Sequence, residues 1–245
     1  MASANGEIPL ASHGDSLRSL PLARGLVFDA AALKRRVQLE QMGGLAFLPL
    51  APRAPRAVSA EPSTLAEWAQ AASQCQACRL CEKRRTVVFG EGHPQAAVMF
   101  VGEAPGMDED LQGRPFVGAA GELLTKIIQA LKLTREDVYI ANTVKCRPPQ
   151  NRVPQPDELA ACRRYLDAQI ALIKPRVICT LGRTAANALL GTEAPLGALR
   201  GRPHRLGDIP VIVTYHPAHL LRHPEAKRDT WADVQQLIPY CRPVR

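Results

Sequence analysis

Residues 97–106 have the sequence AVMFVGEAPG, which is the clearest indication of the fold. It begins with a short apolar run that ends at Gly102, which is typical of a buried strand. Three further runs of the same kind follow, at Val138–Val144, Arg176–Leu181 and Pro210–Tyr215. The chain is therefore expected to contain four short buried strands.

The segments between these runs are patterned as helices. Gly118–Lys132 places its apolar residues on one helical stripe, and Asp157–Lys174 follows Pro156 and begins with two acidic residues, a common helix start. Two more helices are predicted at Thr184–Leu190 and Glu225–Ile238. Strands that alternate with helices predict a parallel sheet covered on both faces. Binding sites in such folds lie beyond the carboxyl ends of the strands.

Charge and composition narrow the class of partner. The chain has 245 residues, with 31 Lys and Arg against 23 Asp and Glu, a net charge of +8. Residues 71–245 carry 24 basic and 17 acidic side chains, so a net +7 belongs to this part. This balance favours a polyanion or an anionic surface as partner. Because no apolar run approaches the ~20 residues of a membrane helix and no secretory signal begins the chain, we expect a cytoplasmic protein with no membrane partner.

A boundary is predicted near residue 63. Residues 1–63 mix Ala, Arg and Pro and end in the linker-like stretch APRAPRAVSAEPS. One amphipathic stretch, Phe28–Met42, is the candidate helix of this part. We expect a flexible or loosely docked, partly disordered extension at 1–63 and one folded domain at 64–245.

Unusual residues follow three of the predicted strands. The first strand leads into the glycine-rich segments 102–110 and 113–118, where the backbone can approach a ligand closely, although a tight turn explains the same residues. No Gly-Lys-Ser/Thr follows, which excludes a phosphate-binding P-loop. The second strand leads to Asn142, whose amide can read the edge of a base or close a turn. The fourth leads to His216, a residue suited to acid–base or electrostatic work.

Two leucines follow that histidine beside basic Arg222. We expect Leu220 and Leu221 to be exposed, and Leu220 is the candidate wedge into a base stack. The alternative is that both are core residues.

Seven cysteines are present, and a reducing compartment disfavours disulfides between them. Cys75 and Cys78 form a CxxC pair of the kind found in zinc and iron–sulfur sites, and Cys81 extends it to CxxCxxC. Cys146 and Cys162 lie after the second strand and early in a helix. Four thiolates from these segments suit a cubane cluster or a tetrahedral zinc equally well. Cys179, inside an apolar strand, is expected to be a buried inert thiol.

Six segments occur together in one order: CQACRLC, VVFGEG, VGEAPG, GRPFVGAAG, ANTVKCRPPQNRVP and TYHPAHLLR. In this combination the chain, from about Leu65 to Ile238, resembles the family 4 uracil-DNA glycosylases, the iron–sulfur branch of their superfamily. The resemblance implies a three-layer α/β/α sandwich around a four-stranded parallel sheet, and hydrolysis of the bond between uracil and deoxyribose in DNA repair. It also implies a [4Fe-4S] cluster, with ligands at Cys75, Cys78, Cys146 and Cys162. Cys81 matches no ligand position.

By motif position, the implied uracil pocket consists of Glu103, Ala104, Pro105, Phe116, Asn142 and His216. Phe116 would stack on a uracil flipped out of DNA. Asn142 would accept a hydrogen bond from uracil N3–H and donate one to O4, a pattern that cytosine reverses. Glu109, or the turn around Gly106, is the candidate wall against the methyl group of thymine.

Cleavage leaves negative charge on uracil, which His216 and backbone N–H groups would stabilise. In the best-known branch of the superfamily an Asp stands where this chain has Ala104. Glu103 is then the nearest carboxylate that could activate water, and the alternative is that backbone groups alone position the water. The implied partner is uracil-containing DNA, single- or double-stranded, and we expect the protein to be a monomer.

Three other functions fit part of the pattern. One is a sister iron–sulfur glycosylase of broader base range, which Glu103 and Asn142 disfavour. Another is a noncatalytic or covalently trapping uracil-DNA binder, although GRPFVGAAG lacks the basic insertion of the trapping branch. The third is a zinc-stabilised α/β nucleotide-binding protein, which the colour of the purified protein would separate from an iron–sulfur protein.

Overall fold

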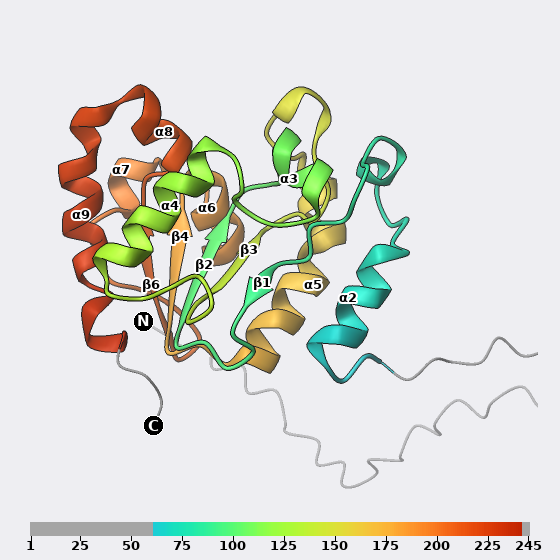
Figure 1. Cartoon of the computed structure of the whole chain (residues 1–245), viewed down its shortest axis with the longest axis horizontal. Coiled ribbons are helices and arrows are strands. Elements are labelled where there is room, and N and C mark those ends of the chain that lie inside the picture. Colours follow the sequence, from blue (N-terminus) through green and yellow to red (C-terminus); the bar gives the residue numbers. More distant parts are fainter. Residues whose placement is uncertain (1–60, 242–245) are drawn as a thin grey trace, which may run out of the picture. The chain divides into compact units, whose positions relative to one another are not determined.

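The computed structural model describes residues 61–241, and Figure 1 shows their arrangement. Most of the predicted extension, with its candidate helix Phe28–Met42, lies outside the described residues. The first described helix, α2 (Leu65–Ser73), begins after Thr64, whose side chain accepts a hydrogen bond from the backbone N–H of Glu67. The Glu67 carboxylate accepts one from the backbone of Thr64 in return, so a capping box starts the helix. The domain boundary at residue 63 stays a prediction.

Six strands form one sheet in the order β1-β3-β2-β4-β6-β5. Their bounds are β1 Glu91–Gly92, β2 Val98–Gly102, β3 Tyr139–Asn142, β4 Val177–Leu181, β5 His204–Leu206 and β6 Ile209–Thr214. The four inner strands run parallel, and they are the four that the apolar runs predict. The expectation of a four-stranded sheet is nevertheless wrong, because β1 and β5 pair antiparallel at the two edges. These edge strands are two and three residues long and partly exposed, so no apolar run marks them.

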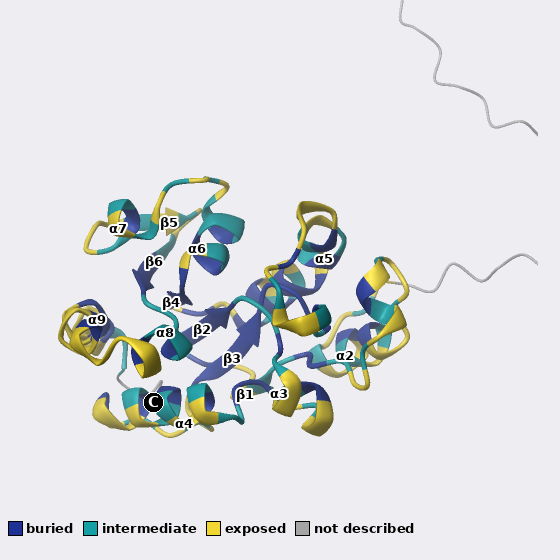
Figure 2. Cartoon of the chain, turned by 90° about the horizontal axis from the view of Figure 1, so that it is seen from above, coloured by how far each residue is buried: buried dark blue, intermediate teal, exposed yellow. Residues whose placement is uncertain are grey.

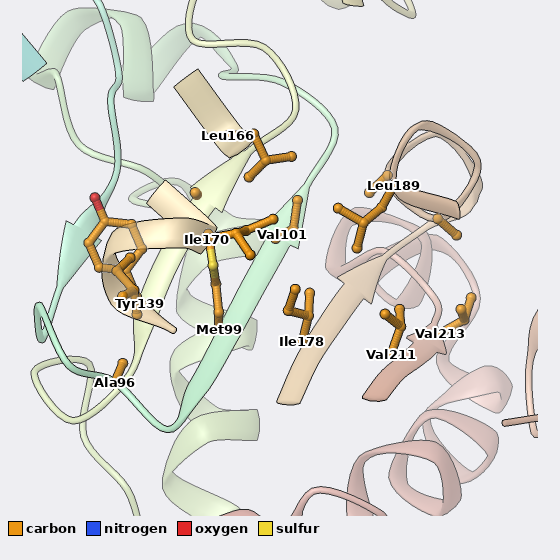
Figure 3. Packing of buried hydrophobic residues seen from close by; sticks show 14 of the residues in the cluster. Ala96, Met99, Val101, Tyr139, Leu166, Ile170, Ile178, Leu189, Val211 and Val213 are labelled. Carbon is orange, nitrogen blue, oxygen red and sulfur yellow. The ribbon is translucent and has the colours of Figure 1, made fainter. Parts of the chain in front are cut away.

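Helices cover both faces of this sheet, because successive strand residues point to opposite sides. Met99 and Val101 of β2 face one core, which they share with Ile178, Val211 and Val213 (Figure 3). Its covering helices are α5 (Pro156–Ile173), α6 (Arg183–Leu190) and α7 (Leu196–Leu199).

The second core lies on the other face of the sheet. Val98 and Phe100 point into it, and α4 (Ala119–Ala130) and α9 (Lys227–Gln235) cover it. Figure 2 shows β2 and β3 buried between the two helical layers, whose outer sides are exposed. The mixed α/β architecture with helices on both faces is thereby confirmed.

A third apolar cluster lies beside the sheet, where α2 packs against α5 (Figure 1). The rings of Trp68 and Tyr165 meet edge to face there, with centroids 5.8 Å apart. Cys146 and Cys162 belong to the same cluster. The cysteine-rich part of the chain is therefore attached to the flank of the sheet rather than to one of its faces.

The carboxyl ends of the parallel strands lead into short elements. β2 is followed by α3 (Met107–Gln112), β3 by a 3-10 turn at Pro149–Asn151, and β6 by α8 (Pro217–Arg222). The helix predicted over 225–238 is shorter than expected: α9 has nine residues, with a 3-10 turn on either side. None of the described helices is long and apolar enough to cross a membrane.

Candidate active site

A cavity of about 590 Å³ opens at the carboxyl ends of β2, β3 and β6. Every residue predicted for the pocket lines it: Glu103, Ala104, Pro105, Glu109, Phe116, Asn142 and His216. Basic side chains lie at the same cavity, among them Arg222, which is exposed, and Arg152, which holds Glu158 through two hydrogen bonds of 2.8 and 2.7 Å. The fold thus brings together residues that are far apart in the sequence.

Asn142 ends β3 and is 1% exposed. Its Oδ1 atom is buried and has no hydrogen-bond partner among the described residues. A buried acceptor without a partner costs about 1–3 kcal/mol, so this oxygen is suited to a donor on a bound ligand. Gly102 lies opposite Asn142 in the sheet, and a Cβ there would collide with both the amide oxygen and the ring of Phe116.

Phe116 has a φ of 54°, in the left-handed region that non-glycine residues seldom adopt. Arg135 holds this backbone, because its guanidinium donates to the carbonyl oxygens of Pro115 at 2.7 Å and Phe116 at 3.0 Å. Glu91 accepts from Arg135 at 2.7 Å and from Arg114 at 2.8 Å.

The centroid of the Phe116 ring lies 5.6 Å from the centroid of the His216 ring. Sequence reasoning missed Arg135, which lies outside the quoted motifs, and gave no role to Glu91, although Glu91 lies in VVFGEG.

Glu109 joins two loops of the pocket. One carboxylate oxygen accepts from the backbone N–H of Gly106 at 3.0 Å. The other accepts from the N–H groups of Val117 at 2.9 Å and Gly118 at 3.2 Å. Glu109 therefore fixes the wall that it lines, while its part in excluding thymine stays a prediction.

His216 follows β6 and caps α8, because its Nδ1 accepts a hydrogen bond from the N–H of Ala218 at 3.1 Å. Burial, with a smaller contribution from Arg222, lowers the pKa of His216 to about 4, and nearby Glu109 opposes the shift. The imidazole is therefore neutral at pH 7. Since Nδ1 is an acceptor, the proton is on Nε2, which makes Nε2–H the free donor of this side chain.

The cysteines predicted as ligands line a second, smaller cavity between α2, the 3-10 turn at Arg79–Glu82 and α5. They are Cys75, Cys78, Cys146 and Cys162, and Cys81 lines the same cavity. Across residues 61–241 no group of three or more His, Cys, Asp or Glu side chains is arranged so that it could hold a metal ion.

The donors around the cysteine cavity nevertheless fit a group held by thiolates. Arg84 donates to Cys146 Sγ at 3.3 Å, and the N–H of Lys145 donates to Cys162 Sγ at 3.2 Å. Burial raises the pKa of Cys162 to about 11 and also raises that of Cys146. Such thiols are protonated at pH 7 on their own, and a metal centre would displace the protons.

Lys145 lines the cysteine cavity and is 1% exposed. Its Nζ donates to the carbonyl oxygen of Asn142 at 2.9 Å and to Oε1 of Gln169 at 2.6 Å. Burial lowers its pKa to about 8. This lysine joins the segment that carries Asn142 to helix α5, which carries Cys162.

Comparison with known proteins identifies the family of this chain. The model of the uracil DNA glycosylase superfamily matches residues 89–235. A type-4 uracil-DNA glycosylase of Thermotoga maritima is 48% identical over 157 residues, which cover 62% of this chain and 82% of that protein. One from Sulfurisphaera tokodaii is 45% identical over 163 residues, covering 63% and 74%. The chain belongs to the type-4 uracil-DNA glycosylases.

A type-5 uracil-DNA glycosylase of Thermus thermophilus is also similar, at 35% identity over 116 residues. That likeness covers 41% of this chain and 52% of the relative, less than the type-4 matches on every measure. The type-4 family that the order of motifs predicts is thereby confirmed.

In this type-4 uracil-DNA glycosylase one exposure prediction is wrong. Leu220 is 1% exposed, whereas Leu221 is 48% exposed. The reason is the short helix α8, which packs against α4 and turns Leu220 inward while Leu221 points outward. Leu221 therefore has the accessible side chain that a wedge requires. Cys179 is buried in β4, as expected of an inert thiol.

Proposed function

We propose that this protein flips uracil out of DNA and hydrolyses its N-glycosidic bond, releasing free uracil and leaving an abasic site. The observation that carries the proposal is Asn142, a buried amide whose unpaired oxygen lies beside the ring of Phe116 in the cavity that His216 also lines. The type-4 family to which the chain belongs supports the same function.

Base recognition follows from the Asn142 amide. Oδ1 would accept from uracil N3–H, and the amide NH₂ would donate to O4. Cytosine presents an acceptor at N3 and a donor at N4, so it would leave two polar groups mismatched in a buried site. Phe116 supplies a flat face for stacking.

Bond cleavage uses the Nε2–H of His216. Uracil leaves the sugar as an anion, and this donor would stabilise the charge at O2 as it develops. A water molecule then adds to the sugar carbon and gives up one proton, and one proton ends on uracil. Glu103, which lines the cavity, is the carboxylate that we assign to orienting this water.

We assign Cys75, Cys78, Cys146 and Cys162 to a [4Fe-4S] cluster. When bound, such a cluster supplies a crosslink between four thiolates of separate segments. The chain's own part is to hold the sulfur atoms, with Arg84 and the Lys145 N–H donating to two of them. Because Cys146 is four residues from Asn142, holding the cysteine also fixes the segment that reads the base.

The DNA contact is assigned to the basic part of the chain, since residues 71–245 carry the net +7. The finer statements of this proposal are that the protein acts as a monomer, in the cytoplasm, on single- or double-stranded DNA.

The test is incubation of the full-length protein with oligonucleotides that carry uracil, thymine or cytosine at one position. We expect free uracil and an alkali-labile site from the first oligonucleotide only. Asn142→Asp should cut uracil excision, because it replaces the amide donor. Asn187→Asp is the matched control, since Asn187 Oδ1 is also buried and unpaired but lies on α6, outside the cavity. Release of no base, or unchanged excision by Asn142→Asp, would contradict the proposal.

A further inference from the structure

Three aromatic rings stack on one another beside the active-site cavity. They belong to Tyr215, which follows β6, to His219 in α8 and to His223, which follows α8, so they are spaced four residues apart. The ring centroids of Tyr215 and His219 are 4.8 Å apart with planes 15° from parallel, and those of His219 and His223 are 4.4 Å apart at 25°. We call these three residues the ring ladder.

The inner end of the ring ladder is anchored in the protein. The guanidinium of Arg200 lies over the ring of Tyr215, 4.0 Å from its centroid. Arg200 is bound to Asp233 at 2.7 Å, and Asp233 also accepts from Thr214 at 2.8 Å. A stack that is fixed at one end keeps its outer ring in a defined orientation, so a partner of that ring meets a preorganised surface.

The outer end of the ring ladder is open. The His223 side chain is 50% exposed, and its Nδ1 contacts Glu225 at 3.2 Å. That contact is made by an atom at the edge of the His223 ring. It does not involve the ring face on the side away from His219. Within residues 61–241 the series of ring contacts ends at His223.

The ring ladder lies where the proposed DNA substrate must pass. His219 and Arg222 line the same cavity as Asn142 and His216. Leu221, beside them, is exposed. A nucleotide next to a flipped uracil would therefore leave the cavity along α8, past a positive charge and an open aromatic face.

We propose that the outer face of His223 is a stacking site for the DNA base next to the flipped uracil. The inference rests on the proposed function, because flipping removes the stacking partner of that neighbouring base. Continuing the ring ladder by one base would replace the lost partner. Every base has a π-face, so the site would take any of the four bases.

The test measures DNA binding with cleavage blocked. The full-length protein is titrated against a single-stranded oligonucleotide that carries one 2′-fluoro-2′-deoxyuridine, because fluorine disfavours the positive charge that cleavage puts on the sugar. In one oligonucleotide both neighbours are adenine, and in the other both are abasic spacers. Dissociation constants are read by fluorescence anisotropy for the wild type, His223→Ala and His223→Phe.

His223→Ala should weaken binding of the adenine-flanked oligonucleotide about 5–10-fold and change the spacer-flanked one by less than about twofold, as expected for one lost stacking contact. His223→Phe should bind like the wild type. His93→Ala is the matched control: His93 is exposed but lies at the opposite edge of the sheet, before β2, and should change neither constant.

Three binding results would overturn the stacking site, the first of which is normal binding by His223→Ala. An equal loss on both oligonucleotides would show that no base is contacted, and a His223→Phe variant as weak as His223→Ala would show that the ring binds phosphate through its N–H. Free uracil from an ordinary deoxyuridine oligonucleotide reports on the proposed function separately. A wild type that releases uracil while His223→Ala binds normally loses the stacking site alone, whereas one that releases none loses both.

Discussion

The uracil pocket and the cysteine cavity share the segment from Asn142 to Cys146, yet they are built in different ways. The pocket lies at the ends of three parallel strands, which position Asn142 and His216 and whose backbone positions are fixed by strand pairing. Glu109 of α3 and Phe116 of the following loop complete it. The cysteine cavity lies beside the sheet, between α2, a 3-10 turn and α5, and no strand pairing joins these walls.

This difference explains why the two regions have different residues. Strand ends hold a pocket in place without a crosslink, so its residues are free to be polar and partly unpaired, as Asn142 is. Walls that come from separate helices and turns need a bond between them, which four thiolates around the proposed cluster would provide. Loss of the crosslink should therefore reach the pocket through the shared segment and Lys145, whereas a change inside the pocket should leave the cysteine cavity intact.

The largest effect should come from a change within the pocket. His216→Ala removes the donor to the departing uracil, and we expect single-turnover excision to fall by ~10²–10³. Substrate binding should change much less, because the charge develops in the transition state. The brown colour of the cluster should stay, as the cysteine cavity is untouched. Undiminished excision by this variant would show that backbone N–H groups stabilise the anion by themselves.

The converse change tests the crosslink. Cys146→Ala should bleach the protein and lower its melting temperature by about 10 °C, the shift for a loss of about 3–4 kcal/mol in a domain of this size. Excision should fall too, because the segment of Asn142 is released. Cys81→Ala is the control from the same cavity and should stay brown. A bleached Cys81→Ala beside a brown Cys162→Ala would reverse the ligand assignment.

Acid gives a third, smaller effect that belongs to the pocket. The pKa of His216 is about 4 in the folded protein, against ~6.5 for an unperturbed histidine. The unfolded chain therefore binds more protons between these values, and the free energy of unfolding should decline as the pH falls below 6.5. Between pH 6.5 and pH 5 the loss should be roughly 2 kcal/mol. Denaturant titrations of the wild type and His216→Gln should differ by this slope, and parallel curves would refute it.

The smallest effect should come from the support of Phe116. Arg135→Lys loses the two-pronged contact with the Pro115 and Phe116 carbonyl oxygens. A strained backbone costs about 1–3 kcal/mol to hold, so we expect kcat/KM for uracil excision to fall about tenfold. Arg114→Lys is the control, because Arg114 is 58% exposed and contacts the same Glu91 without touching the Phe116 backbone. Equal effects of the two variants would mean that Glu91, rather than Phe116, is what Arg135 serves.

Much of the pocket could be predicted from the sequence because buried parallel strands are recognisable as apolar runs. Once four such runs are placed, their carboxyl ends must meet at one edge of the sheet, which brings Asn142 and His216 together. The edge strands could not be found this way. β5 pairs antiparallel with β6, and its three side chains alternate between half-buried and exposed, so they form no apolar run.

The supporting residues were missed for a related reason. Arg135 donates to carbonyl oxygens of another segment and Lys145 to the carbonyl oxygen of Asn142, and a backbone carbonyl has no signature in the sequence. Leu220 was misplaced because α8 is a single short helix of six residues. So few positions define no stripe, and only the packing against α4 decides which leucine is buried.

The position of β6 has a consequence for how the protein becomes active during its synthesis. Chains leave the ribosome amino end first, so the cysteines, Phe116 and Asn142 are all made before the strand that carries His216. β6 joins the sheet by pairing with β4, and this pairing brings His216 to the pocket. A growing chain that ends before β6 contains the residues assigned to base reading but lacks His216, the residue assigned to stabilising the departing base. Excision by a growing chain should therefore stay far below that of the full chain until β6 has joined the sheet.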